Sequence, residues 1–143
     1  MGFVLNKHYI VGRMLGHGGF GITYLTYDTI LSRCVAAKEF FPFGLSARRP
    51  ETFTVTNMTG DMLEAFQRGK EKFFEEARSL AGLAGHPNIV TIHDFFEGNG
   101  TAYFVMTYYE GCDFSQYLKN TRDKLSFPET MRLLSPIMNA LDY

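Results

Sequence analysis

The sequence is poor in features that would mark several common classes of protein. Its only two cysteines, Cys34 and Cys112, lie far apart and lack metal-site spacing, so we expect two reduced thiols and no disulfide framework. The four histidines are scattered, and we expect no metal site. No tract of basic residues is present and the formal net charge is −1, which argues against nucleic acid as a partner.

Long apolar runs are also missing. No stretch approaches the length of a membrane span, and the first residues lack a charged leader followed by an apolar core. We therefore expect a cytoplasmic protein without a membrane segment. The 45% hydrophobic content is enough to build a core, and 143 residues fit one domain or one lobe of a larger domain.

The most informative pattern is a cluster of glycines followed by a lysine. Gly16, Gly18 and Gly21 have G-x-G-x-x-G spacing, which lets a backbone approach phosphate groups closely. Downstream, the run Val35-Ala36-Ala37-Lys38 ends on a side chain that supplies a positive charge for such phosphates.

The residues after the last glycine distinguish two kinds of phosphate loop. A dinucleotide-binding fold, and with it an oxidoreductase, requires a helix to begin there. Residues 22–27 are instead β-branched and aromatic, which predicts a strand. The glycines are therefore expected to join two strands and to cover a ligand as a flap.

The rest of the chain alternates between strand and helix patterns. Residues 42–61 are irregular, and we interpret them as an exposed insertion, with a short strand over 53–56 as the alternative. The second long helix is expected to begin at the capping box Ser126-x-x-Glu129 and to bend at Pro136. The predicted strands cover 9–14, 22–27, 34–41, 88–96 and 102–108, and the predicted helices cover 62–84, 113–119 and 126–143.

Periodicity selects a carboxylate partner for the lysine. In the strand 34–41, alternation places Ala36 and Lys38 on one face. In the helix 62–84, Glu76 lies between Phe73 and Leu80 on the apolar stripe, whereas Glu75 has only polar helical neighbours. We therefore expect Glu76 to point inward and to pair with Lys38.

Several motifs occur in the order typical of one family. Besides the glycines, the lysine and Glu76, these are His86-Pro87-Asn88-Ile89-Val90 and Val105-Met106-Thr107-Tyr108-Tyr109-Glu110-Gly111. On these residues the chain resembles the N-terminal lobe of a bacterial-type Ser/Thr protein kinase. The resemblance implies an α+β fold with a five-stranded antiparallel sheet and one long helix, followed by a hinge and the truncated first helices of the C-terminal lobe. The implied boundaries are 1–106 for the N-terminal lobe, with the insertion at about 42–61, then 107–112 for the hinge and 113–143 for the start of the second lobe.

The resemblance also implies roles for individual residues. Lys38 and Glu76 would be the catalytic pair, with Lys38 on the α- and β-phosphates of ATP. The backbone of Thr107 and Tyr109 would hydrogen-bond adenine, and Asp113 would contact ribose. Met106 would be the gatekeeper. The implied ATP-binding residues are Leu15, Gly16, Gly18, Gly21, Thr23, Ala36, Lys38, Val90, Met106, Thr107, Tyr109 and Asp113. Thr23 departs from the family's usual valine but keeps the β-branch.

Two motifs needed for phosphoryl transfer do not occur in these 143 residues. The family takes its catalytic carboxylate from a His-Arg-Asp loop and its Mg²⁺ ligands from a downstream asparagine and from Asp-Phe-Gly. Asp94-Phe95-Phe96 imitates the last motif but precedes Met106. We therefore expect a kinase that uses ATP, Mg²⁺ and protein substrates when complete, and a chain that alone lacks the metal ligands and is inactive or nearly so.

The last predicted helix carries an apolar stripe of Leu134, Ile137, Met138 and Leu141. Such a stripe, if exposed, marks a missing partner or a site of self-association. We therefore expect a truncated kinase. The alternative is a non-catalytic, pseudokinase-like module that senses a nucleotide or docks a protein through this helix.

Overall fold

The computed structural model describes residues 3–49, 52–57, 60–121 and 124–143. The chain forms two compact units, one of residues 1–84 with 90–108 and one of residues 85–89 with 109–143. The sheet, the long helix and the glycine motif belong to the first unit.

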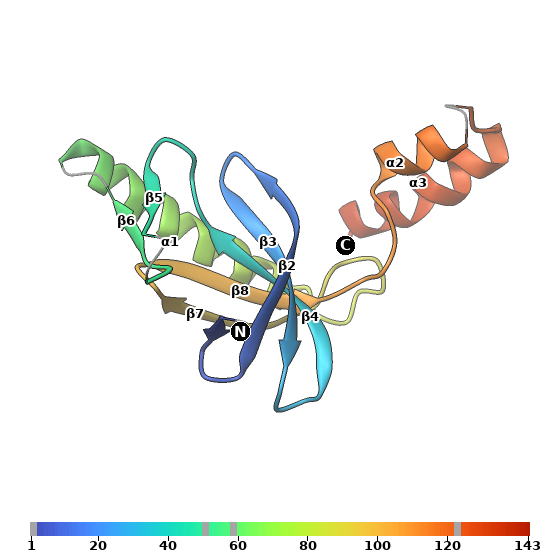
Figure 1. Cartoon of the computed structure of the whole chain (residues 1–143). Coiled ribbons are helices and arrows are strands. Elements are labelled where there is room, and N and C mark those ends of the chain that lie inside the picture. The colour runs from blue at the N-terminus through green and yellow to red at the C-terminus, as the bar shows by residue number, and fades with distance from the viewer. Residues whose placement is uncertain (1–2, 50–51, 58–59, 122–123) are drawn as a thin grey trace. The chain divides into compact units, whose positions relative to one another are not determined.

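The first unit is built on a six-stranded antiparallel sheet (Figure 1). The five predicted strands all form, but the predicted five-stranded sheet was one strand short. The additional β1 pairs with the start of β2 and is only two residues long, too short to show any periodicity. In sheet order the strands are β1 (Val4–Leu5), β2 (Tyr9–Gly18), β3 (Gly21–Asp28), β4 (Arg33–Phe40), β8 (Thr101–Thr107) and β7 (Ile92–Gly98).

Two neighbouring strands of the sheet, β4 and β8, are buried on both faces. Alternate residues of β4 therefore enter two different clusters, because successive side chains point to opposite faces of a sheet. Phe40 joins the cluster that packs under the long helix, whereas Val35 and Ala37 join the cluster on the other face, with Leu5 of β1 and Tyr9 of β2.

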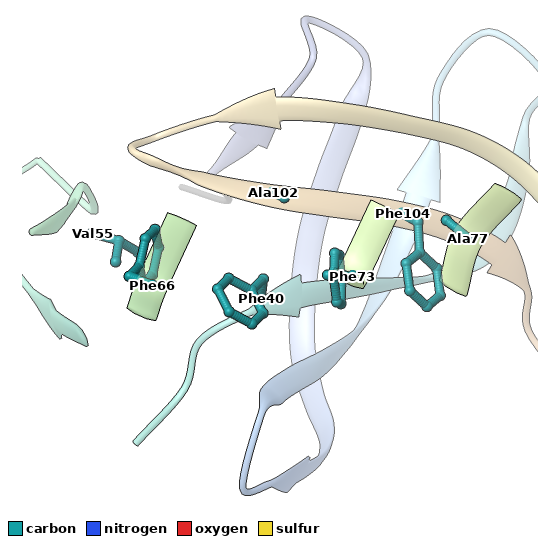
Figure 2. Packing of buried hydrophobic residues seen from close by; sticks show 7 residues of the cluster. All are labelled: Phe40, Val55, Phe66, Phe73, Ala77, Ala102 and Phe104. Atoms are coloured by element: carbon teal, nitrogen blue, oxygen red, sulfur yellow. The ribbon is translucent and has the colours of Figure 1, made fainter. Parts of the chain in front are cut away.

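The helix α1 (Asp61–Gly82) covers one face of this sheet (Figure 1). Its buried residues Phe66, Phe73 and Ala77 follow each other at seven and four positions, the spacing of one helical face. Figure 2 shows these side chains against Phe40 of β4 and Phe104 of β8. The helix ends three residues before Gly85, close to the predicted end.

The segment between β4 and α1 differs from the prediction of an exposed insertion. Strands β5 (Ser46–Arg48) and β6 (Val55–Asn57) form a two-stranded sheet of their own, as in the alternative. Val55 is only 3% exposed and belongs to the core under α1 (Figure 2). Turn residues and charges are common in this segment, so its composition resembles that of a surface loop although Val55 is buried.

The second unit contains α2 (Phe114–Asn120) and α3 (Phe127–Leu141). The predicted capping box is present, because the Ser126 amide donates to Glu129 Oε2 at 2.8 Å. The hydrogen bond from the Ser126 hydroxyl, and then the one from the Ser126 amide, hold the pKa of Glu129 below its ordinary value. Neither helix has a buried residue among those described.

Candidate nucleotide-binding site

The glycine motif lies at the turn between β2 and β3. Gly16 pairs with Thr23 and Gly18 with Gly21, and Gly19 and Phe20 form the tip. The chain continues after Gly21 as strand β3, as predicted. A helix does not begin there, so the dinucleotide-binding fold is ruled out as an explanation of this glycine spacing.

The glycines differ in what the fold itself requires of them. A Cβ at Gly21 would lie 2.4 Å from the carbonyl oxygen of Glu39, so the packing of β3 against β4 excludes any side chain there. A Cβ at Gly16 or Gly18 would meet no atom within 4 Å. The packing of this chain gives no reason for glycine at positions 16 and 18, which leaves backbone access and flexibility as the reason.

Lys38 and Glu76 are joined by an ion pair between β4 and α1. Lys38 Nζ lies 2.8 Å from Glu76 Oε1, and the two side chains are 29% and 47% exposed. Lys38 Nζ also lies 5.1 Å from the ring centroid of Phe104 and 5.6 Å from that of Phe73, within cation–π range. The ammonium is therefore held by a carboxylate and two aromatic rings, which restricts its flexible stem.

A cavity of about 280 Å³ opens beside this pair. Its lining comes from the glycine turn, from β4 and from α1, so the ammonium of Lys38 faces space next to the motif that precedes it. The lining residues are Phe20, Lys38, Phe40, Gly69, Lys72, Phe73 and Glu76.

Strand register places the predicted residues Thr23 of β3 and Ala36 of β4 on the face of the sheet that carries Lys38. Thr23 is directly opposite Lys38, and residues directly opposite in an antiparallel pair share one face. Ala36 lies two residues before Lys38 on that face and is 4% exposed. Leu15 lies between Met14 and Gly16, where the register of β2 with β3 shifts. Such a shift is a β-bulge, which changes the direction of the side chains beside it.

Met106 and Thr107 are at the end of β8. Met106 is directly opposite Ala36 and packs against the core under α1. The Thr107 amide donates to the Thr91 carbonyl at 3.0 Å, so an adenine contact by the Thr107 backbone requires its carbonyl oxygen. Val90 precedes β7 and is half-buried.

The remaining two predicted residues, Tyr109 and Asp113, belong to the second unit. Tyr109 is exposed. Asp113 is the N-cap of α2, and its Oδ1 accepts from the Gln116 amide at 2.8 Å. Asp113 therefore has a structural role as a helix cap, which was not part of the prediction that it contacts ribose.

A polar cluster that was not predicted from the sequence lies on the other face of the sheet. Glu39 is 1% exposed, and its carboxylate accepts from Tyr103 at 2.6 Å and from Tyr24 at 3.0 Å. Arg48 of β5 forms an ion pair with it. The strand pattern could have indicated this cluster, because alternation places Glu39 on the same face as the apolar Val35 and Ala37. A carboxylate on an apolar face must be paired if it is buried.

The described residues contain neither a metal-binding cluster nor a helix that could span a membrane, and the sequence Asp94-Phe95-Phe96 lies in a strand. The described residues hold no group of three or more His, Cys, Asp or Glu side chains that could bind a metal ion. No described helix combines the length and apolar character that crossing a membrane requires. Asp94 lies in β7, where its Oδ2 accepts from Tyr9 at 3.3 Å and from Asn6 at 3.2 Å, so its contacts are structural.

Comparison with known proteins agrees with this geometry. The model of the protein kinase domain matches residues 9–143. The chain therefore belongs to the protein kinase family. It is 30% identical over 125 residues to serine/threonine-protein kinase PknD of Chlamydia abortus, covering 87% of this chain and 11% of that protein. It is also 30% identical over 137 residues to serine/threonine-protein kinase PrkC of Bacillus subtilis, covering 96% of this chain and 18% of that protein.

A solved structure shows the same fold. The apo form of PpkA-294 superposes with a TM-score of 0.88 at 32% identity, covering 97% of this chain and 48% of that chain. The chain thus spans about half of this structure and less than a quarter of the two curated relatives described above. The resemblance to bacterial Ser/Thr kinases and the α+β fold of the N-terminal lobe are therefore confirmed.

Proposed function

We propose that this chain carries the ATP-binding part of a Ser/Thr protein kinase, which transfers the γ-phosphate of ATP to protein hydroxyls. The observation that supports this most directly is the 2.8 Å ion pair of Lys38 with Glu76, on the sheet face that also carries Ala36. We also propose that residues 1–106 act as the N-terminal lobe, 107–112 as the hinge and 113–143 as the start of the second lobe. The proposed setting is the cytoplasm.

The residues present fit a nucleotide. Open space at Gly16 and Gly18 leaves room for phosphates near the backbone of the glycine turn, and Lys38 offers them a positioned charge. Adenine would be enclosed by Leu15, Thr23, Ala36, Val90 and Met106, with hydrogen bonds to the backbone of Thr107 and Tyr109 and a ribose contact from Asp113. Phosphoryl transfer needs Mg²⁺ ligands and a catalytic carboxylate. These 143 residues hold neither motif that supplies them, so we expect the chain alone to bind ATP weakly and to transfer little phosphate.

Titration of ATP into the chain tests this proposal. ATP at about 100 times its Kd stabilises a protein that binds it by about 2.7 kcal/mol, measured by chemical denaturation. Lys38→Met removes a charge-assisted contact, and we expect it to weaken ATP binding by about tenfold to a hundredfold. Lys70→Met is the matched control, because Lys70 also forms a 2.8 Å ion pair, with Glu97, but does not line the cavity beside Lys38.

Two results would contradict the proposal. If saturating ATP leaves the unfolding free energy unchanged, the chain has no nucleotide site. If Lys38→Met and Lys70→Met weaken ATP binding equally, Lys38 has no particular role. Robust phosphate transfer by the chain alone that Lys38→Met abolishes would overturn the expectation of inactivity.

A second candidate function is a non-catalytic interaction module. The observation that favours it is the apolar stripe on α3, where Leu134, Ile137, Met138 and Leu141 are between 38% and 83% exposed. In that case the chain self-associates, and Leu134→Asp suppresses the dimer in analytical ultracentrifugation. Dimerisation of this kind, combined with no stabilisation by ATP, would favour the interaction module over the kinase site.

A further inference from the structure

The segment between β4 and α1 contacts both the sheet that carries Lys38 and the helix that carries Glu76. It contains the hairpin of β5 and β6, which is not part of the six-stranded sheet. Among its contacts, one set is made through Arg48 and another through Val55. Neither residue lines the cavity beside Lys38.

The first attachment is the ion pair of Arg48 with the buried Glu39, the residue next to Lys38 in β4. The guanidinium also donates to the Phe53 carbonyl at 2.9 Å and lies 5.1 Å from the ring of Phe41. Burial alone would lower the pKa of Arg48, but the hydrogen bond and the charge of Glu39 outweigh burial and raise it. Arg48 therefore ties β5 to the strand that presents the lysine.

The second attachment is at Val55 of β6. Its amide donates to the Asn99 carbonyl at 2.7 Å, in the turn between β7 and β8. A Cβ on Gly100, which has φ of +76°, would lie 2.4 Å from the Val55 carbonyl oxygen, so the two backbones are in close contact. The Val55 side chain belongs to the same core cluster as Phe66 of α1 (Figure 2).

Val55 adds to the packing of Phe66 on Phe40 in the first half of α1, whereas Phe73 packs on Phe40 and Phe104 in its middle. A helix held at points spread along its axis resists tilting better than a helix held at one point. Phe66 and Glu76 are ten residues apart, about 15 Å along a helix. A small tilt about Phe73 would therefore change the distance from Glu76 to Lys38.

We propose that β5 (Ser46–Arg48) and β6 (Val55–Asn57) form a brace that helps to hold α1 where Glu76 reaches Lys38, with Arg48 and Val55 as positioning residues. The importance of this position for phosphate binding rests on the proposed function. The brace itself does not, because it concerns the geometry of the free chain.

Hydrogen exchange in the 143-residue chain without nucleotide tests the brace. Val55→Ala removes the side chain that packs with Phe66, so exchange of the α1 amides should rise about tenfold relative to the β4 amides. The ε-methylene NMR signal of Lys38, identified by its loss in Lys38→Met, should move toward its position in Glu76→Gln. That variant defines the unpaired lysine.

Val105→Ala is the matched control, since Val105 is equally buried but lies in the cluster on the other face of the sheet. It should change α1 and β4 exchange together and leave the Lys38 signal in place. If Val55→Ala does not fold, the milder Val55→Thr takes its place. The double variant Arg48→Met with Glu39→Gln tests the other attachment without leaving a buried charge unpaired.

The proposal is overturned if folded brace variants keep the wild-type ratio of α1 to β4 exchange and the wild-type Lys38 signal. A nucleotide titration separates this from the function proposed above. If the wild type does not bind ATP, the kinase site fails, while exchange and NMR still decide the brace. If it does bind, Val55→Ala should weaken ATP about threefold to tenfold, and this effect should disappear in the Glu76→Gln background.

Discussion

At the scale of single residues, glycines in one motif meet different physical demands. Gly21 is excluded from carrying a side chain by the Glu39 carbonyl oxygen, whereas Gly18, its partner across the turn, faces open space. Glycine at position 21 is required by the packing of β3 against β4. Glycine at position 18 is not required by packing, and it leaves the backbone accessible to a ligand. The motif therefore combines a packing requirement of the sheet with the backbone access that the proposed function needs.

Substitution of the two paired glycines should separate these demands. Gly21→Ala forces β3 and β4 apart, and we expect it to lower the free energy of unfolding by about 1–3 kcal/mol. Gly18→Ala should change it by less than about 0.5 kcal/mol and should act on ATP affinity instead. Urea denaturation of both variants measures the difference. Equal losses of stability would show that the open space at Gly18 does not exist in solution.

The tyrosines around Glu39 predict a loss of stability in alkali. Burial, with the charge and hydrogen bond of Glu39, raises the pKa of Tyr24 to about 12 and raises that of Tyr103 as well. In the unfolded chain both ionise near pH 10. Their contribution is therefore complete below pH 10 and is lost as the pH rises toward 12, because the unfolded state releases protons first.

The slope of stability against pH tests this. Between about pH 10 and 11.5, the unfolding free energy should fall less steeply in Tyr24→Phe than in the wild type, by the effect of one proton. Tyr27→Phe, on the same strand but 41% exposed, is the control. An unchanged slope in Tyr24→Phe would mean that Tyr24 does not keep its proton in the folded state.

At the scale of elements, α1 depends on a small number of aromatic contacts. Phe66 and Phe73 both pack with Phe40. Their ring centroids lie 5.1 Å and 5.5 Å, respectively, from the ring centroid of Phe40. A Cβ on Gly69 would lie 2.7 Å from the Phe40 ring, which shows how closely that ring approaches the helix backbone. The packing of these rings holds the helix that supplies Glu76 against the sheet, and its N-cap makes no side-chain hydrogen bond.

Truncation of the first of these aromatic side chains should be costly. Phe66→Ala leaves a cavity in the core, and we expect a loss of about 3–5 kcal/mol in the free energy of unfolding. Met62→Ala, one turn earlier and 44% exposed, should cost less than about 0.5 kcal/mol. Chemical denaturation of the two variants provides the measurement. Similar losses would mean that the start of α1 does not pack on the sheet.

At the scale of the whole molecule, the two units differ in how their elements are stabilised. The first unit contains two clusters of buried residues, one between the sheet and α1 and one on the other face of the sheet, whereas α2 and α3 have no buried residue among those described. Helices of 7 and 15 residues, the lengths of α2 and α3, are only marginally stable in water without tertiary packing. The stability of the second unit in this chain therefore comes mainly from local features such as the Ser126 capping box.

Hydrogen exchange along the chain should reveal this difference. We expect α3 amides to exchange within about tenfold to a hundredfold of free-peptide rates, while β4 and β8 amides approach the protection set by global unfolding. Ser126→Ala should accelerate exchange in the first turn of α3 and leave β4 unchanged. Protection of α3 equal to that of β4 would show that the two units unfold together.

The sequence by itself determined the strands, the long helix and the face on which Lys38 and Glu76 lie. These depend on periodicity and motif spacing, which are local properties of the chain. Only the tertiary structure decided that β1 extends the sheet, that Val55 is buried and that Glu39 pairs with Arg48. Those outcomes depend on which distant segments meet, and a buried carboxylate selects its partners in space and not by their distance along the chain.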